Sequence, residues 1–122
     1  MRIEARALLF DMLEAARLIS RFTEGRSFGG YTEDPMLRSA VERQFEIIGE
    51  ALNKLSKVDP ALASQIPEFR QVISFRNVLI HGYATVQDEV VWGVVETRLP
   101  TLLATFEQLL GDDNDPSLVE DT

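Results

Sequence analysis

The sequence predicts an all-α protein, a bundle of four main helices joined by short connections. Apolar residues recur at spacings of three and four along most of the chain, as one face of a helix requires. Two Asp-Pro pairs give the signal of an N-cap followed by proline at the first helical position. No segment alternates between apolar and polar residues as a strand does, and no internal repeat is visible. These observations favour helices packed around one apolar core.

The first predicted helix runs from about Ile3 to Thr23. Gly25 is a plausible end signal, and the following SFGGY is predicted to be a loop. The apolar residues that we expect to face the core recur at helical spacing. They are Ile3, Ala7, Phe10, Leu13, Ala16 and Ile19, with Leu18 as the alternative to Ile19.

The second predicted helix opens at Asp34-Pro35 and ends near Ser56. Its apolar stripe consists of Leu37, Val41, Phe45, Ile48, Leu52 and Leu55. Gly49 lies in the middle of this helix, where glycine costs up to ~1 kcal/mol relative to alanine. We therefore expect another helix to approach closely at Gly49.

The remaining helices are marked by proline and glycine. Asp59-Pro60 opens a short helix over ALASQI, and Pro67 starts a third main helix that ends near His81, before Gly82. A fourth helix starts near Gln87 or Asp88 and keeps the helical period to Gly111. Its apolar residues are Val90, Val94 (with Val91 and Val95), Leu99, Leu102, Phe106 and Leu109. Pro100 lies inside this pattern, so a kink or a break is expected there.

The length and composition of the chain fit one domain. The domain is expected to span residues 1–110 of the 122, with residues 111–122 as an acidic, disordered tail. The absence of cysteine excludes disulfides, thiolate catalysis and cysteine-ligated metals, and fits a reducing compartment. The N-terminus is charged throughout, unlike a signal peptide, and no apolar run approaches the roughly 20 residues that span a bilayer. A soluble, cytoplasmic protein without membrane contact is expected.

The formal net charge of -8 argues against binding nucleic acid through bulk charge. The tail contributes five acidic residues and no basic one. They are Asp112, Asp113, Asp115, Glu120 and Asp121. Without them the body is only mildly acidic, so a local basic site on it is compatible with the sequence.

The third main helix contains SFRNVLIHGY, with an arginine, the one histidine and a tyrosine in a short span. At ~100° per residue, four polar residues fall on one narrow stripe, and an apolar arc lies opposite with Arg76 in its middle. The stripe is Arg70, Ser74, Asn77 and His81, and the arc is Val72, Ile73, Leu79 and Ile80. A buried, unpaired charge costs several kcal/mol, so Arg76 requires a carboxylate, a cleft or a subunit boundary.

Each of these side chains also has a structural interpretation. Arg76 is commonly explained by an ion pair, and Glu42, Glu46 and Glu50 on the second helix are its candidate partners. Its planar fork also suits bidentate contact with a phosphate. A lone histidine at a helix end is more often a cap or a favourable charge at the C-terminal dipole. Tyr83 taken alone is a packing residue with its hydroxyl in water.

Taken together, Arg76, His81 and Tyr83, with Asn77 after the arginine, resemble the motif of HepT-like toxins in the HEPN superfamily. The segments DMLEAARLISRFTEG, RSAVERQFEIIGEALNKLS and RNVLIHGYATVQDEVVWGVVETRLP are also similar to that family. The likeness extends over nearly the whole chain to about Leu110. The stretch IPEFRQV is less typical, because members often carry a tryptophan after the proline.

The resemblance implies a HEPN-type bundle of four to five helices that forms a homodimer, with the motif in a cleft at the subunit boundary. It implies metal-independent cleavage of an RNA substrate and no cofactor. It also implies a partner, a minimal nucleotidyltransferase antitoxin that modifies the motif tyrosine, Tyr83, by nucleotidyl transfer (AMPylation). The chain would then be the toxin of a type VII-like toxin–antitoxin system.

The residues suit this chemistry. Cleavage without metal requires removal of a proton from the 2′-hydroxyl, stabilisation of the phosphorane charge and protonation of the leaving 5′-oxygen. Histidine suits the first or third step and arginine the second, while Asn77 can orient the imidazole or the phosphate. One chain supplies only His81 for two proton transfers, whereas two chains across a two-fold axis supply two imidazoles and two copies of Arg76.

The alternative function is a non-catalytic HEPN module that binds a nucleotide or a partner. The excess of acidic over basic residues favours this alternative. Arg76 would then form an ion pair or contact a nucleotide phosphate, and His81 would cap the helix. A metal site is not expected, because one histidine and no cysteine leave only scattered carboxylates.

Overall fold

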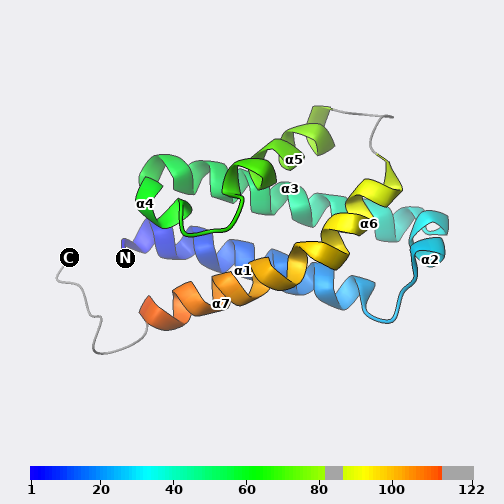
Figure 1. The fold of residues 1–122 in the computed structure, drawn as a ribbon, viewed down its shortest axis with the longest axis horizontal. Helices are drawn as coiled ribbons and strands as arrows, with labels where there is room; N and C mark the ends of the chain where they lie inside the picture. The colour runs from blue at the N-terminus through cyan, green and yellow to red at the C-terminus, as the bar shows by residue number, and fades with distance from the viewer. Residues whose placement is uncertain (82–86, 114–122) are drawn as a thin grey trace.

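The chain folds as a bundle of helices. The structure is a computed structural model that describes residues 1–81 and 87–113, and over these residues it is all-helical. Its helices are α1 (Ile3–Thr23), α2 (Phe28–Glu33), α3 (Pro35–Val58), α4 (Pro60–Ala63), α5 (Phe69–His81), α6 (Asp88–Thr97) and α7 (Leu99–Asp113). In Figure 1, α1, α3 and α7 run along the long axis, and α5 lies beside α3 at the edge of the bundle. The predicted all-α class is confirmed for these residues.

The core lies where α1 packs against α3 and α7. The predicted stripe of α3 is buried over its whole length, from Leu37 through Phe45 to Leu55. α7 contributes Phe106, which is fully buried, and α2 contributes Tyr31. The helical period therefore identified the inner face of α3 correctly.

The inner face of α1 was predicted only in part. The helix has the expected bounds, and Leu13, Ala16 and Ile19 are buried as predicted. Ile3, Ala7 and Phe10 were wrongly assigned to the core, since Ile3 is 89% exposed, Phe10 is 54% exposed and Ala7 is also exposed. The core-facing residues of the first turns are instead Ala5, Leu9 and Met12. Apolar residues lie on more than one side of this helix, so its period alone did not select the packed side.

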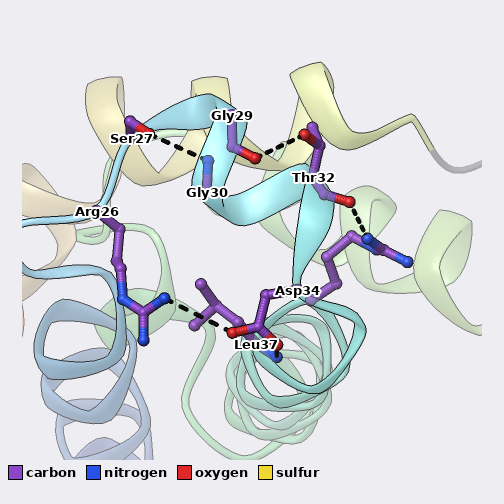
Figure 2. A network of polar contacts seen from close by, with 8 residues as sticks. Arg26, Ser27, Gly29, Gly30, Thr32, Asp34 and Leu37 are labelled. Carbon is purple, nitrogen blue, oxygen red and sulfur yellow. Dashed lines mark hydrogen bonds and ion pairs between the residues drawn. The ribbon is translucent and has the colours of Figure 1, made fainter.

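The predicted SFGGY loop is wrong, because the short helix α2 forms there. The Ser27 hydroxyl accepts a hydrogen bond from the Gly30 amide at 3.1 Å, and the Thr32 hydroxyl donates to the Gly29 carbonyl at 2.9 Å (Figure 2). Tyr31 is fully buried and anchors the helix to the bundle. A side-chain cap and one buried aromatic residue thus offset the low helix propensity of two glycines.

Both Asp-Pro pairs act as predicted. Asp34 Oδ1 accepts a hydrogen bond from the Leu37 amide at 3.0 Å, and Asp59 Oδ1 accepts one from the Leu62 amide at 3.1 Å. Asp34 also pairs with Arg26 at 3.6 Å, which ties the α1–α2 connection to the start of α3 (Figure 2). α4 spans Pro60–Ala63, so the short helix predicted over ALASQI (61–66) ends three residues earlier than predicted.

The fourth predicted helix is broken at Pro100, as expected. α6 ends at Thr97 and α7 begins at Leu99, so the proline stands in the first turn of α7, where its missing N–H costs no helical bond. Val90, predicted to face the core, is 49% exposed, whereas Val91 and Val95 are buried.

The C-terminal end of the described chain extends slightly beyond the prediction. α7 continues through Gly111 to Asp113, so the predicted domain end at residue 110 falls inside this helix. The tail prediction for residues 114–122 lies outside the described residues. Over the part that is described, no helix combines the length and apolar character needed to cross a membrane.

Candidate functional site

The candidate residues lie on α5, and this helix presents the polar stripe and the apolar arc that its helical periodicity predicted. The polar stripe is exposed along its whole length, from Arg70 through Asn77 to His81. Val72 and Leu79 on the opposite arc are buried. The arc faces α3, the helix against which α5 makes its main contacts.

Gly49 sets the distance between α3 and α5. A Cβ atom built on Gly49 would lie 2.2 Å from Cβ and 2.8 Å from Cγ of Arg76. Any larger residue would therefore overlap the stem of the arginine side chain. The predicted close approach at Gly49 is confirmed, and the element that approaches is the motif helix at Arg76.

The Arg76 guanidinium is held by its neighbour on the exposed stripe. Arg76 Nη1 donates a hydrogen bond to Asn77 Oδ1 at 2.9 Å. Arg76 Nε is buried and has no hydrogen-bond partner in the described part of the chain. A buried donor without a partner costs about 1–3 kcal/mol. The half-buried side chain therefore retains hydrogen-bonding capacity that its surroundings do not satisfy.

The ion pair that was the structural alternative for Arg76 is not found among residues 1–81 and 87–113. Glu46 pairs instead with Arg43 at 3.3 Å, and neither Glu42 nor Glu50 comes within ion-pair distance of Arg76. The positive charge at Arg76 is thus positioned without being neutralised. This arrangement is suited to an anion that arrives from outside the chain, such as a phosphate.

His81 is the last residue of α5, and its side chain is exposed. Asn77 lies one turn before it on the same stripe, whereas Arg76 is about 140° away around the helix axis. Arg76 and His81 of one copy therefore leave the helix on different sides, and the Asn77 contact links the guanidinium to the stripe that carries the imidazole. Tyr83 and Gly82 lie outside the described residues.

A second polar cluster, which was not predicted from the sequence, joins α2, α3 and α6. Arg38 Nε lies 3.8 Å from Asp88 Oδ1, and Arg38 Nη1 donates to the Thr32 carbonyl. Burial and the neighbouring charge of Asp88 raise the pKa of Glu42. Burial, Glu42 and Asp88 also raise the pKa of Tyr31, whose buried hydroxyl has no partner in the described chain. The i, i+4 spacing of Arg38 and Glu42 was the available signal in the sequence.

An open apolar groove of about 250 Å³ runs beside α5. It is lined by residues of α3, α5, α6 and α7, among them Phe75, Val78 and Val94. Val78 is 48% exposed. At one end Arg98 bonds to Gln71 at 3.3 Å and pairs with Glu68. The motif helix thus has an unfilled apolar side next to its polar stripe.

Comparison with known proteins gives a consistent result. The family model described as Ribonuclease HepT-like matches residues 12–109. The chain is 37% identical over 101 residues to the probable ribonuclease HepT of Thermococcus cleftensis, covering 83% of this chain and 91% of that protein. It is 30% identical over 109 residues to a candidate RNase of Methanocaldococcus jannaschii, covering 89% of each. A candidate RNase of Caldanaerobacter subterraneus is 30% identical over 105 residues, covering 86% of this chain and 93% of that protein. No solved structure matches the chain.

Proposed function

The chain belongs to the Ribonuclease HepT-like family, and we propose that it is a metal-independent endoribonuclease, the toxin of a type VII-like toxin–antitoxin pair. The observation that carries the proposal is the state of Arg76. Its guanidinium is fixed by Asn77, has a buried Nε without a partner among the described residues and is not neutralised by a carboxylate there. A scissile phosphate supplies the missing acceptor and the missing negative charge.

The proposed active form is a homodimer. Arg76 and His81 of one copy leave α5 on different sides, so a single copy does not surround a phosphate with both groups. A two-fold axis beside α5 would bring two imidazoles and two guanidinium groups into one cleft. The open apolar groove beside Phe75 and Val78 supports this location, because a second copy would bury it.

The reaction in that cleft is a transesterification. His81 of one copy accepts the proton of the 2′-hydroxyl, and the 2′-oxygen attacks the adjacent phosphorus. Arg76 stabilises the negative charge that develops on the phosphorane oxygens. The protonated imidazole of His81 in the partner copy donates its proton to the departing 5′-oxygen. The products are a 2′,3′-cyclic phosphate and a 5′-hydroxyl, with no net change in protons.

The experiment is RNA cleavage by the purified protein in the presence of EDTA, with analysis of the product ends. Wild-type protein should yield 2′,3′-cyclic phosphate ends. His81→Ala and Arg76→Ala should each reduce kcat by at least about 10²-fold, as expected for loss of a proton-transfer group or of a charge-stabilising donor. Both variants should remain dimers. A His81→Ala variant that still cleaves RNA and arrests growth refutes the proposal, and RNA binding without cleavage by wild-type protein supports the non-catalytic module instead.

The proposed regulation acts on Tyr83, two residues beyond His81. Attachment of a nucleotide by a co-encoded nucleotidyltransferase would add bulk and negative phosphate charge beside the cleft, and both would exclude RNA. Tyr83→Phe should therefore remain toxic in the presence of that antitoxin. Silencing of Tyr83→Phe to the wild-type level would show that the antitoxin acts by another route.

A further inference from the structure

The motif helix is an acid-free surface on an acidic protein. The chain has a net charge of -8, yet residues 69–87 contain no Asp or Glu, and this is the longest such stretch in the sequence. Among the described helices of eight or more residues, α5 alone has no acidic residue. A polyanion that is repelled by the rest of the surface therefore meets the least repulsion along α5.

The exposed stripe of α5 has the positive charge of Arg70 at one end and the imidazole of His81 at the other. Arg70 and His81 are eleven residues apart on the same side of the helix, which at 1.5 Å per residue places their backbones about 16 Å apart. Ser74 and Asn77 lie between them, and both can hydrogen-bond to an anionic strand. The stripe thus presents two groups that can carry positive charge, joined by neutral polar side chains.

Arg70 has no carboxylate partner in the described chain, whereas five other arginines there have one. Arg17 is paired with Glu14, and Arg43 is paired with Glu46. Arg70 instead lies over the ring of Phe69, at 5.3 Å from its centroid. The ring restricts the side chain without neutralising it. Arg70 also lies in the first turn of α5, where the helix dipole adds to the attraction for an anion.

We propose that Arg70 binds a backbone phosphate of a single-stranded RNA several nucleotides from the cleavage position, and that the stripe from Arg70 to His81 is the track of that strand. This inference rests on the proposed ribonuclease function and adds a substrate-binding residue outside the motif. With an axial rise of about 3.4 Å per phosphate along a stacked strand, 16 Å corresponds to no more than about five phosphates, and to fewer if the strand is extended.

RNA fits this surface better than an acidic partner protein does. Arg70 and His81 are separated by a narrow line of neutral hydrogen-bonding groups rather than clustered in one patch. One end of that line is the imidazole proposed to act on RNA. The track therefore predicts a dependence on substrate length, which an interface for an acidic protein does not.

The test is binding of uncleavable 2′-O-methyl RNA to Arg70→Gln, with Arg17→Gln as the control. The control loses the same charge from α1, a helix that is not among those packed against α5. Binding of an octanucleotide is followed by fluorescence anisotropy across a salt series, and binding of a dinucleotide by NMR titration. Loss of one phosphate contact should weaken octanucleotide binding about fivefold at 0.1 M salt and reduce the slope of log Kd against log salt by about 0.7.

Dinucleotide binding should be the same for Arg70→Gln and wild type, because its single phosphate does not reach Arg70 from His81. Arg70→Lys should restore most of the octanucleotide affinity. The proposed track is overturned if Arg70→Gln and Arg17→Gln weaken RNA binding equally, or if the weakening does not depend on the length of the oligonucleotide. An octanucleotide affinity that is unchanged in Arg70→Gln overturns it as well. Since binding is measured without cleavage, a protein that binds RNA through Arg70 but never cleaves it refutes only the proposed function.

Discussion

At the scale of single residues, Arg76 combines a structural cost with an available charge. A half-buried guanidinium with an unpaired Nε would be stabilised by any nearby carboxylate. The helix against which α5 packs, α3, carries three glutamates at four-residue spacing, Glu42, Glu46 and Glu50. Within the described residues none of them pairs with it, and its polar contact there is the neutral amide of Asn77. A neutral partner fixes the direction of the guanidinium while leaving its charge for an incoming anion. Asn77 is therefore a positioning residue for Arg76 in the proposed reaction.

This role predicts the behaviour of Asn77→Ala. A hydrogen bond to a charged group contributes about 1.5–3 kcal/mol, so its loss should lower kcat/KM by roughly tenfold or more, with less effect than Arg76→Ala. In the Arg76→Ala background, Asn77→Ala should have no further effect, because the group that it positions is absent. Steady-state cleavage rates of the four proteins in this double-mutant cycle provide the measurement. Additive losses would mean that Asn77 acts independently of Arg76.

At the scale of the elements, the contact between α3 and α5 depends on one missing side chain. Gly49 leaves room for the stem of Arg76, so the two helices approach closely at the point where the motif begins. Gly49 lowers the intrinsic stability of α3, and in return it allows Arg76 to lie directly against that helix.

Gly49→Ala should destabilise the protein by about 1–3 kcal/mol, because the added Cβ would overlap the Arg76 stem and force α5 away from α3. The matched control is Gly93→Ala in α6, where an added Cβ meets no atom within 4 Å. That variant should be more stable by roughly 0.5–1 kcal/mol, the ordinary gain of alanine over glycine in a helix. Urea denaturation of both variants measures the difference. A stabilised Gly49→Ala protein would show that the two helices are not in close contact.

The elements that could be predicted from the sequence are those whose signals are local. The Asp34 and Asp59 caps and the break at Pro100 depend on neighbouring backbone groups, so short sequence patterns were sufficient. α2 was missed because its stability depends on burial of Tyr31, which is a tertiary effect. The exposed half of the α1 stripe was misassigned because the helical period identifies an apolar side of a helix but does not show which side packs against another helix. The polar stripe of α5 was predicted, whereas the Asn77 contact that holds Arg76 required coordinates.

The polar cluster between α3 and α6 predicts a pH dependence of stability. Burial, Asp88 and Glu46 raise the pKa of Glu42, against the opposing effect of Arg38. The folded state therefore binds this proton more tightly than the unfolded state does. The resulting stabilisation is present below the ordinary carboxyl pKa and is lost as the pH rises through the raised value.

Glu42→Gln should consequently be more stable than wild type at pH 7, since it keeps the shape of the side chain without the half-buried charge. The advantage should shrink as the pH is lowered towards about 4, where the wild-type carboxyl is protonated in both states. Urea denaturation between pH 4 and 8 tests this, with Glu96→Gln at an exposed position of α6 as the matched loss of one negative charge. An advantage that is constant with pH would mean that Glu42 ionises without penalty.

At the scale of the whole molecule, the acid-free helix and the open groove lie on the same part of the bundle. α5 packs mainly against α3, and its residues Phe75 and Val78 line the groove together with residues of α3, α6 and α7. The negative charge elsewhere repels RNA and leaves α5 as the accessible surface. A second copy seated on the groove would place two motif helices side by side within that region.

The predicted consequence concerns Val78. Val78→Asp should convert the proposed dimer to a monomer, because an isologous interface receives each substitution twice and two carboxylates would be buried near the axis. Phe10→Asp is the control, an exposed apolar side chain on α1 (54% against 48% for Val78) that should leave the dimer intact. Analytical ultracentrifugation gives the oligomeric state. Cleavage by Val78→Asp should fall by the same order as in His81→Ala, although Arg76, Asn77 and His81 are unchanged. If Val78→Asp were monomeric and fully active, one imidazole would perform both proton transfers and the two-fold cleft would not be needed.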